Sequence, residues 1–219
     1  MNRAEAEPAA RGAGATVPTL PWTGERCVPE AMHPQSRIVV EHLARYTWAV
    51  ERLASLPPHR VVLDAPCGAG YGTALLATAP SVAIAVGIDI DPATIAYARD
   101  RYGTPGRVNF GMGDLTRLRA RADVVVCFEG IEHVVDQAAA AYSLYAALKP
   151  GGLLLLSTPR AGSPGAGSPY HTREFSLAAL EDLFAPYLVE TAAWGQTRAV
   201  GDTNLADAWY IVFEGRRKD

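Results

Sequence analysis

Short apolar runs alternate along the chain with segments whose apolar residues recur at helical spacing. The runs that predict strands lie at 60–65, 82–89, 108–110, 123–128 and 153–157, with two later ones near 187–194 and 209–213. The helical patterns lie at 35–55, 71–79, 92–102, 136–148 and 177–184. Strand–helix alternation of this kind predicts right-handed crossovers and a doubly wound sheet.

Two of the predicted strands contain uninterrupted apolar stretches, Val124–Val126 and Leu153–Leu156. A strand without alternation is typical of a parallel sheet, where both faces are buried. Asp91 and Pro92 supply a cap and a first-turn proline for the helix that follows them. The fold class predicted is therefore α/β: a Rossmann-like, doubly wound and mostly parallel sheet with helices on both faces.

The organisation predicted along the chain has three parts. Residues 1–19 are rich in Ala, Gly, Pro and Glu and predict a disordered tail. Residues 20–58 form an N-terminal helical cap segment, and residues 59–219 form one α/β domain. Within that domain the Pro/Gly/Ser-rich segment 159–169 follows a strand end and predicts a mobile loop over a site.

Composition narrows the classes of function. Hydrophobic residues make up 49% and charged residues 20%, with a formal net charge of −3 and no Lys/Arg block. This balance gives no general attraction to nucleic acid or anionic lipid, so neither is an expected partner. The three cysteines have no zinc-type spacing. With no signal-peptide pattern and no apolar run long enough to span a bilayer, we expect a cytoplasmic protein that is not in the membrane.

A glycine-rich turn follows the first predicted strand, with glycines at 68, 70 and 72. Glycine lets the backbone turn sharply and approach a ligand closely. The spacing is Gly-x-Gly-x-Gly, which differs from the Gly-x-Gly-x-x-Gly of dinucleotide sites. Asp64 lies just before the turn, where it either fixes the loop or meets a cationic amino group. Both features point away from a pyrophosphate ligand.

Acidic residues end the next two strands. Asp89 stands where an acid can accept hydrogen bonds from both hydroxyls of a ribose, the alternative being an ordinary loop residue. Ile90 is placed to pack on an adenine face. Asp114 follows the third strand, where it either accepts from an adenine amino group or serves a turn. Together these residues predict a nucleoside site.

Glu129, Glu132 and His133 follow the central strand 123–128. If this turn is helical, the three side chains share one side, and two oxygens with one nitrogen suit Mg²⁺, Mn²⁺ or a related divalent ion. A histidine is alternatively a general base near neutral pH. His171 would return over the same sheet edge, to complete the metal shell or touch the substrate. Structural roles for both histidines, in capping a turn or bonding the backbone, stay open.

Five runs together resemble one family: VLDAPCGAGYGT, GIDIDPATIAYAR, GD, ADVVVCFEGIEHV and LKPGGLLLLSTP. They are similar in order and spacing, over roughly residues 60–215, to the class I S-adenosylmethionine-dependent methyltransferases. The resemblance implies S-adenosylmethionine as cofactor and a seven-stranded sheet whose last strand is antiparallel. It also implies cofactor contacts from Gly68, Gly70, Asp89, Asp114 and Phe128. Pro66 departs from the glycine that many members have there, and it should not block binding.

The Glu-x-x-Glu-His run resembles ubiquinone-pathway O-methyltransferases and small-RNA 2′-O-methyltransferases. In those families the positions matching Glu129, Glu132 and His133 are associated with a divalent metal. In the RNA enzymes a later histidine joins them, and His171 is the candidate here.

The stretch TGERCVPE, followed by EHLARY, looks like bacterial methyltransferases found with sugar, polysaccharide and natural-product pathways. By that similarity Arg45 and Tyr46 contact the amino-acid end of the cofactor. A carboxylate there would pair well with Arg45. An exposed helix face is the alternative interpretation of the same two residues.

These resemblances imply an O-methyltransferase that acts on a hydroxyl of a small molecule, a sugar, a cyclitol or a phenolic natural product, with a metal assisting. N-methylation of an amino sugar, RNA 2′-O-methylation and a non-catalytic binding module are the alternatives. The chain has no basic arm to favour RNA. Acceptor specificity is expected in the N-terminal segment, in 159–169 and in 194–207. Oligomeric state is open, a homodimer being one option.

Overall fold

The computed structural model describes residue 20 and residues 26–219. The tail expected over 1–19 lies outside the described residues. Among the helices that the structure describes, none is both long enough and apolar enough to cross a membrane.

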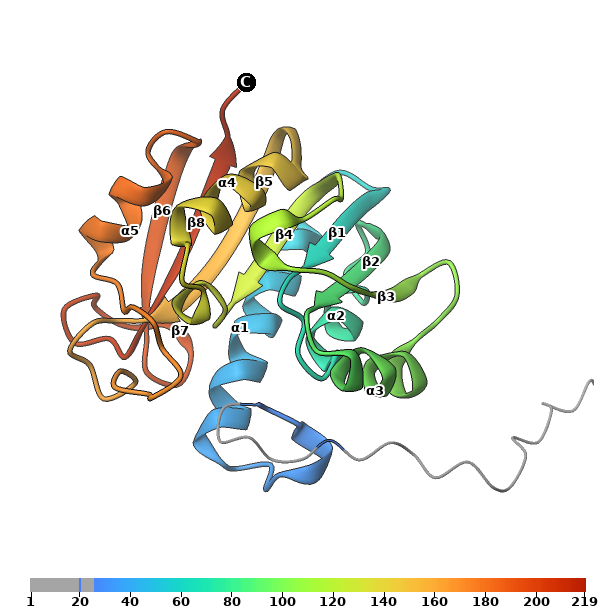
Figure 1. Ribbon diagram of the computed structural model, residues 1–219, viewed down its shortest axis with the longest axis horizontal. Coiled ribbons are helices and arrows are strands. Elements are labelled where there is room, and N and C mark those ends of the chain that lie inside the picture. The colour runs from blue at the N-terminus through green and yellow to red at the C-terminus, as the bar shows by residue number, and fades with distance from the viewer. Residues whose placement is uncertain (1–19, 21–25) are drawn as a thin grey trace, which may run out of the picture.

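The centre of the molecule is an eight-stranded sheet in the order β3-β2-β1-β4-β5-β8-β6-β7 (Figure 1). Its strands are β1 Arg60–Asp64, β2 Val82–Asp89, β3 Val108–Met112, β4 Ala122–Phe128, β5 Leu148–Pro159, β6 Leu188–Gln196, β7 Val200–Thr203 and β8 Tyr210–Arg217. The five strands from β1 to β5 pair in parallel, whereas β8 runs antiparallel to β5 and to β6. The predicted fold class is confirmed.

The strand count differs from the seven implied by the family resemblance, because β7 adds a short antiparallel hairpin to β6. Its residues, Val-Gly-Asp-Thr, carry no strand pattern of their own. The hairpin is held by Asp202, whose carboxylate accepts from the backbone N–H groups of Thr197, Arg198 and Ala199. Local turn bonds of this kind cannot be seen in hydrophobic periodicity.

The helices divide between the two faces of the sheet (Figure 1). They are α1 Arg37–Ala54, α2 Tyr71–Leu76, α3 Pro92–Tyr102, α4 Gln137–Ala147 and α5 Leu177–Phe184, with short 3₁₀ turns η1 Pro29–Ala31, η2 Leu115–Arg117 and η3 Ile131–His133. The first three contribute to one hydrophobic core, and α4 and α5 contribute to the other. Asp91 caps α3 by accepting from Ala93 N at 2.9 Å, which confirms the predicted cap.

Burial on both faces explains the unbroken apolar strands. In β4, Val124 and Val126 enter the core under α1 to α3, whereas Val125 enters the core under α4 and α5. All three are fully buried. Because β1, β2, β4 and β5 are parallel, their carboxyl ends lie at one edge of the sheet, and β1 lies between β2 and β4 at the point where strand order reverses.

Candidate active site

A cavity of about 670 Å³ opens at the carboxyl ends of these strands. Ten of the predicted site residues line it: Tyr46, Gly68, Asp89, Ile90, Asp114, Phe128, Glu129, Glu132, His133 and His171. The cavity is large enough for a drug-sized ligand. Three other predicted residues lie outside the lining and support residues that form it: Arg45, Asp64 and Gly70.

The glycine loop needs its glycines for two reasons. Gly68 and Gly70 have left-handed backbone conformations, with φ of +50° and +90°. A Cβ on Gly70 would lie 2.6 Å from the Cβ of Ala98, and one on Gly72 would lie 2.0 Å from the ring of Tyr46. The loop is thus packed so closely against α1 and α3 that no side chain fits at Gly70 or Gly72.

Asp64 lies buried under this loop. Its carboxylate accepts hydrogen bonds from the Thr73 hydroxyl at 2.6 Å and from the Tyr46 hydroxyl at 3.1 Å. These contacts join β1, α1 and α2, and they are those of a residue that fixes the loop. Burial raises the pKa of the Asp64 carboxyl to about 7.

We expect Asp64→Asn to remove part of the pH dependence of stability. The raised pKa means that between about pH 4 and 7 the unfolded chain has released this proton while the folded chain keeps it. The free energy of unfolding of the wild type should therefore fall, relative to the variant, as the pH rises through this window. Urea unfolding at pH 4, 5.5 and 7 measures the difference, and a constant difference would contradict it.

Asp89 holds the loop from the side of β2. Its Oδ2 accepts from the backbone N–H of Gly68 at 3.0 Å, and its Oδ1 accepts from that of Asp91 at 3.0 Å. Ile90 beside it is 67% exposed, an unusual exposure for an isoleucine, and it lines the cavity. This end of the cavity thus offers a fixed carboxylate next to an apolar surface.

Asp114 caps η2 at the end of β3. Its Oδ1 accepts from both the backbone N–H and the hydroxyl of Thr116, each at 2.8 Å. These bonds lower the pKa of the Asp114 carboxyl. Asp114 therefore stabilises a turn, which was one of the two roles that its sequence position allowed. It also lines the cavity.

Glu132, His133 and His171 come together at the end of β4. One ligand atom from each lies within 4.8 Å of those of the other two. Glu132 is fully buried; its Oε2 accepts from the Thr158 hydroxyl at 3.1 Å, and its Oε1 has no hydrogen-bond partner. Burial and the nearby Glu129 charge raise the pKa of this carboxyl well above its usual range.

Both imidazoles have Nδ1 beside an oxygen. His133 Nδ1 lies 3.2 Å from the carbonyl oxygen of Tyr170, and His171 Nδ1 lies 3.2 Å from Oε1 of Glu174. Carbonyl and carboxylate oxygens only accept, so Nδ1 is the donor in both contacts, and in the neutral imidazole Nε2 is then the nitrogen with the lone pair. The backbone N–H of Thr172 donates to the carbonyl of Glu132 at 2.8 Å, which keeps the two segments together.

Glu129 is not part of this group of three. Its φ is +50°, and the 3₁₀ turn begins only at Ile131, so the helical spacing considered for 129–133 does not reach back to it. Its Oε1 accepts from the Ser157 hydroxyl at 2.7 Å, and its Oε2 lies 3.8 Å from Nη2 of Arg45. The structure thus joins three of the four residues predicted as metal ligands.

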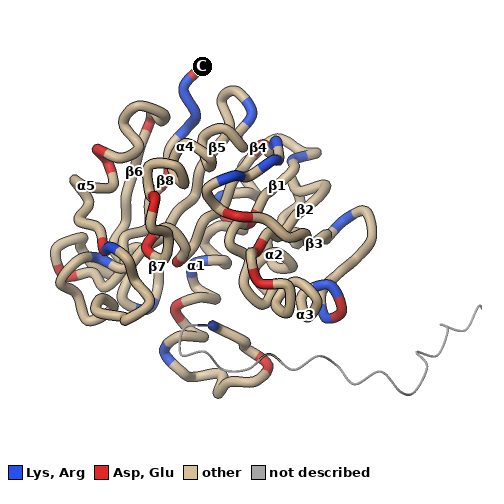
Figure 2. Tube along the Cα trace, in the orientation of Figure 1, with Lys and Arg blue, Asp and Glu red and all other residues tan. Residues whose placement is uncertain are grey.

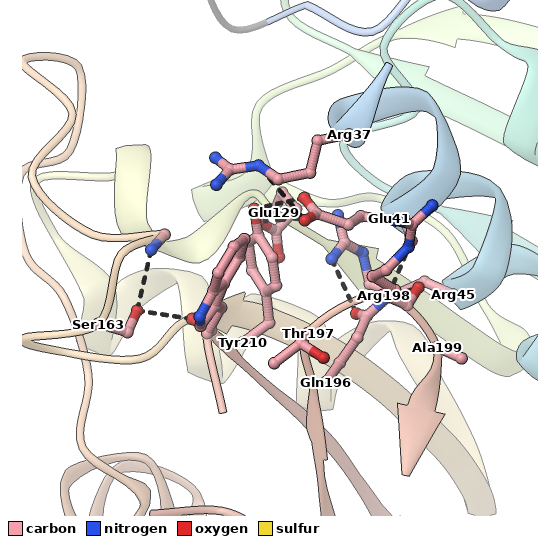
Figure 3. Close-up of polar contacts among 12 residues, drawn as sticks. Arg37, Glu41, Arg45, Glu129, Ser163, Gln196, Thr197, Arg198, Ala199 and Tyr210 are labelled. Atoms are coloured by element: carbon pink, nitrogen blue, oxygen red, sulfur yellow. Dashed lines mark hydrogen bonds and ion pairs between the residues drawn. The ribbon is translucent and has the colours of Figure 1, made fainter. Parts of the chain in front are cut away.

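Arg45 is buried behind the cavity wall, so the exposed helix face considered for it is not found. Its Nη1 donates to Oε1 of Gln196 at 2.9 Å, and its guanidinium lies over the ring of Tyr210 at 4.6 Å (Figure 3). Tyr46, by contrast, lines the cavity and packs edge-on against Phe128 with centroids 5.1 Å apart.

The lining also includes residues that were not predicted as site residues from the sequence, among them Arg37, Glu41, His42 and Tyr210. The first three are spaced along one helix, and nothing in the helical pattern distinguishes them from residues of a solvated face. His42 Nδ1 lies 2.9 Å from the Tyr71 hydroxyl, and burial lowers the pKa of this imidazole well below its usual range. It is therefore neutral at physiological pH.

Comparisons with known proteins agree with this geometry. A family model described as a methyltransferase domain matches residues 40–207. A Mycolicibacterium smegmatis protein named a probable S-adenosylmethionine-dependent methyltransferase is 40% identical over 172 residues, 75% of this chain and 63% of its own length. A ubiquinone biosynthesis O-methyltransferase of Azotobacter vinelandii is 34% identical over 121 residues, 52% of this chain and 50% of its own.

The fold is also similar to that of a solved structure. The magnesium protoporphyrin IX methyltransferase of Synechocystis, with bound SAH, superposes with a TM-score of 0.63 at 18% identity, covering 85% of this chain and 88% of that one. This likeness concerns the fold alone. The chain spans less than two thirds of the length of the Mycolicibacterium relative.

Proposed function

This chain belongs to the methyltransferase domain family, and from that premise we propose that it transfers the methyl group of S-adenosylmethionine to a hydroxyl oxygen of a small molecule. The acceptor is a sugar, a cyclitol or a phenolic natural product. The named relatives support methyl transfer from S-adenosylmethionine. The choice of oxygen rests on the group formed by Glu132, His133 and His171.

The cavity fits the cofactor at the ends of β1 and β2. The Asp89 carboxylate retains lone pairs for the ribose hydroxyls after accepting its two backbone bonds, and Ile90 offers an apolar surface for adenine. Tyr46 and Phe128 wall the cavity beside the glycine loop, where the methionine part would lie. A sulfonium cation is favoured near this predominantly acidic lining.

The same cavity fits a divalent metal at the end of β4. The buried Glu132 carboxyl, one oxygen of which has no hydrogen-bond partner, and the two imidazoles offer a mixed oxygen and nitrogen donor set. Such a set suits Mg²⁺, Mn²⁺ or a related ion. When bound, the ion would lower the pKa of an acceptor hydroxyl. Glu132, His133 and His171 would hold it, and Thr158, Tyr170 and Glu174 would orient them.

The transfer itself is an in-line displacement. The acceptor oxygen forms a bond to the methyl carbon while the carbon–sulfur bond breaks, and its electron pair stays on sulfur to give S-adenosylhomocysteine. With the metal held by Glu132, His133 and His171, the hydroxyl proton would pass to water. In the alternative without a metal, the imidazole of His133 or His171 is suited to take the proton as a general base. An amine acceptor would bring its own lone pair, so it would need neither a metal nor this base.

Removing divalent ions is the test of this proposal. We expect the protein to move a tritium-labelled methyl group from S-adenosylmethionine to hydroxylated acceptors, and we expect chelation followed by gel filtration to lower the rate about 100-fold or more. Addition of Mg²⁺ or Mn²⁺ should restore it. S-adenosylhomocysteine binding should survive chelation. Full activity after chelation would instead favour metal-free transfer, including transfer to an amine.

RNA 2′-O-methylation shares the acidic and histidine group but needs a basic surface. Among the residues coloured in Figure 2, Lys and Arg are interspersed with Asp and Glu over the tube. A small-molecule acceptor is therefore the partner that we propose.

A further inference from the structure

A second set of buried polar side chains lies beside the cavity, where α1 meets β6 and β8 (Figure 3). Glu41 and Arg45 come from successive turns of α1, Gln196 from the end of β6 and Tyr210 from the start of β8. Tyr210 pairs with Pro159 in the β5–β8 ladder, so this set stands over the end of β5. The nucleoside end, at β2, is three strands away in the sheet order.

Glu41 is only 1% exposed, yet it lines the cavity. Its Oε2 accepts from the Tyr210 hydroxyl at 2.8 Å. Its Oε1 lies 3.4 Å from Nε of Arg37 as an ion pair but has no hydrogen-bond partner. A buried carboxylate oxygen without a hydrogen bond lowers the stability of the fold. When such an oxygen lies at a cavity wall, a bound ligand that donates to it is the natural explanation.

Among the described residues, no neighbour donates a hydrogen bond to Glu41 Oε1, and Nε and Nη2 of the buried Arg45 have no hydrogen-bond partner either. Both amide hydrogens of Gln196 are used, because its Nε2 donates to the carbonyl oxygens of Glu41 and Arg198 at 3.0 and 3.2 Å. Its Oε1 accepts from Nη1 of Arg45 at 2.9 Å, which fixes the orientation of that guanidinium. Arg37 is half-exposed, and only its Nε faces the carboxylate.

We infer that Glu41 determines acceptor specificity by accepting a hydrogen bond from a second donor group of the acceptor, a hydroxyl beside the one that is methylated. The inference rests on the proposed function and adds a property of the acceptor, which must carry two donors. A neighbouring hydroxyl suits the place because it donates to Glu41 Oε1 and can accept from Arg37 at the same time.

The variant Glu41→Gln tests this directly. The amide oxygen can keep the bond from Tyr210, and the amide nitrogen then stands where Oε1 was, so an acceptor of hydrogen bonds becomes a donor. Glu51→Gln, on the same helix but exposed, is the matched control. The probes are myo-inositol and methyl α-D-glucopyranoside as polyhydroxylated acceptors and phenol as an acceptor with one hydroxyl.

We expect the wild type and Glu51→Gln to methylate at least one polyhydroxylated probe, and we expect Glu41→Gln to lower kcat/KM for it about 10- to 100-fold, mainly through KM. S-adenosylhomocysteine affinity should be unchanged, which also reports that the variant is folded. Unchanged kcat/KM in Glu41→Gln, or methylation of phenol alone, would overturn the inference. An equal loss of S-adenosylhomocysteine affinity would assign Glu41 to the cofactor instead. A wild type that fails to bind S-adenosylhomocysteine would remove the proposed function itself.

Discussion

Glu132→Gln is expected to lower methyl transfer about a thousandfold while leaving S-adenosylhomocysteine affinity within a few-fold of the wild type. The side chain keeps its size, and its amide can still accept from the Thr158 hydroxyl. What it loses is the ability of the one buried carboxyl in the group with His133 and His171 to ionise and hold a cation. His133→Ala should have a similar effect, because it removes the Nε2 lone pair from the same place.

The control for Glu132→Gln is the same Glu→Gln substitution at a position outside the cavity. Glu181→Gln on α5 is exposed and lies outside the cavity lining, so it should keep the wild-type rate. Initial rates at saturating S-adenosylmethionine, with calorimetric affinities for S-adenosylhomocysteine, separate the two functions. Near-normal rates in both Glu132→Gln and His133→Ala would disprove the metal proposal.

Gly70→Ala is expected to lower the free energy of unfolding by roughly 3–5 kcal/mol and to abolish cofactor binding. The alanine would have to adopt a φ of +90°, and its Cβ would stand 2.6 Å from the Cβ of Ala98 and 2.9 Å from the ring of Phe110. The Cβ of Ala98 is fixed to its helix and the Phe110 ring is buried, so the loop itself would have to shift.

Gly68→Ala separates crowding from backbone strain. Gly68 also has a positive φ, of +50°, but a Cβ there meets nothing within 4 Å. Gly68→Ala is therefore expected to lower the free energy of unfolding by the backbone strain alone, about 1–2 kcal/mol. Urea unfolding of the two variants beside the wild type gives both values. Equal destabilisation by the two alanines would show that contact with Ala98 and Phe110 is not what constrains Gly70.

The parts of this molecule that depend on periodicity were predictable from its sequence. The unbroken apolar strands, the helix caps and the glycine turn each arise from residues near one another in the chain, and α3 and α5 have the predicted bounds. The exception was β7, whose four residues are held by side-chain bonds of Asp202 rather than by an apolar pattern.

The candidate site was predictable where it follows strand ends and less so where it depends on conformation. His133 and His171 come together as expected from their places at one sheet edge. Glu129 turns away because its backbone is left-handed, which residue spacing alone does not reveal. Glu41 and Tyr210 are far apart in sequence and meet only through packing of α1 against β8, so no local signal identifies them.

The proposed nucleoside site is tested by calorimetric titration of the purified protein with S-adenosylhomocysteine. We expect saturable binding of one molecule per chain with an affinity in the micromolar range or tighter. We also expect Asp89→Ala to lose this binding, because it removes the carboxylate that holds Gly68 and that is proposed to bind the ribose. Absence of any binding heat or saturation with the wild-type protein would show that the cavity is not a site for this cofactor.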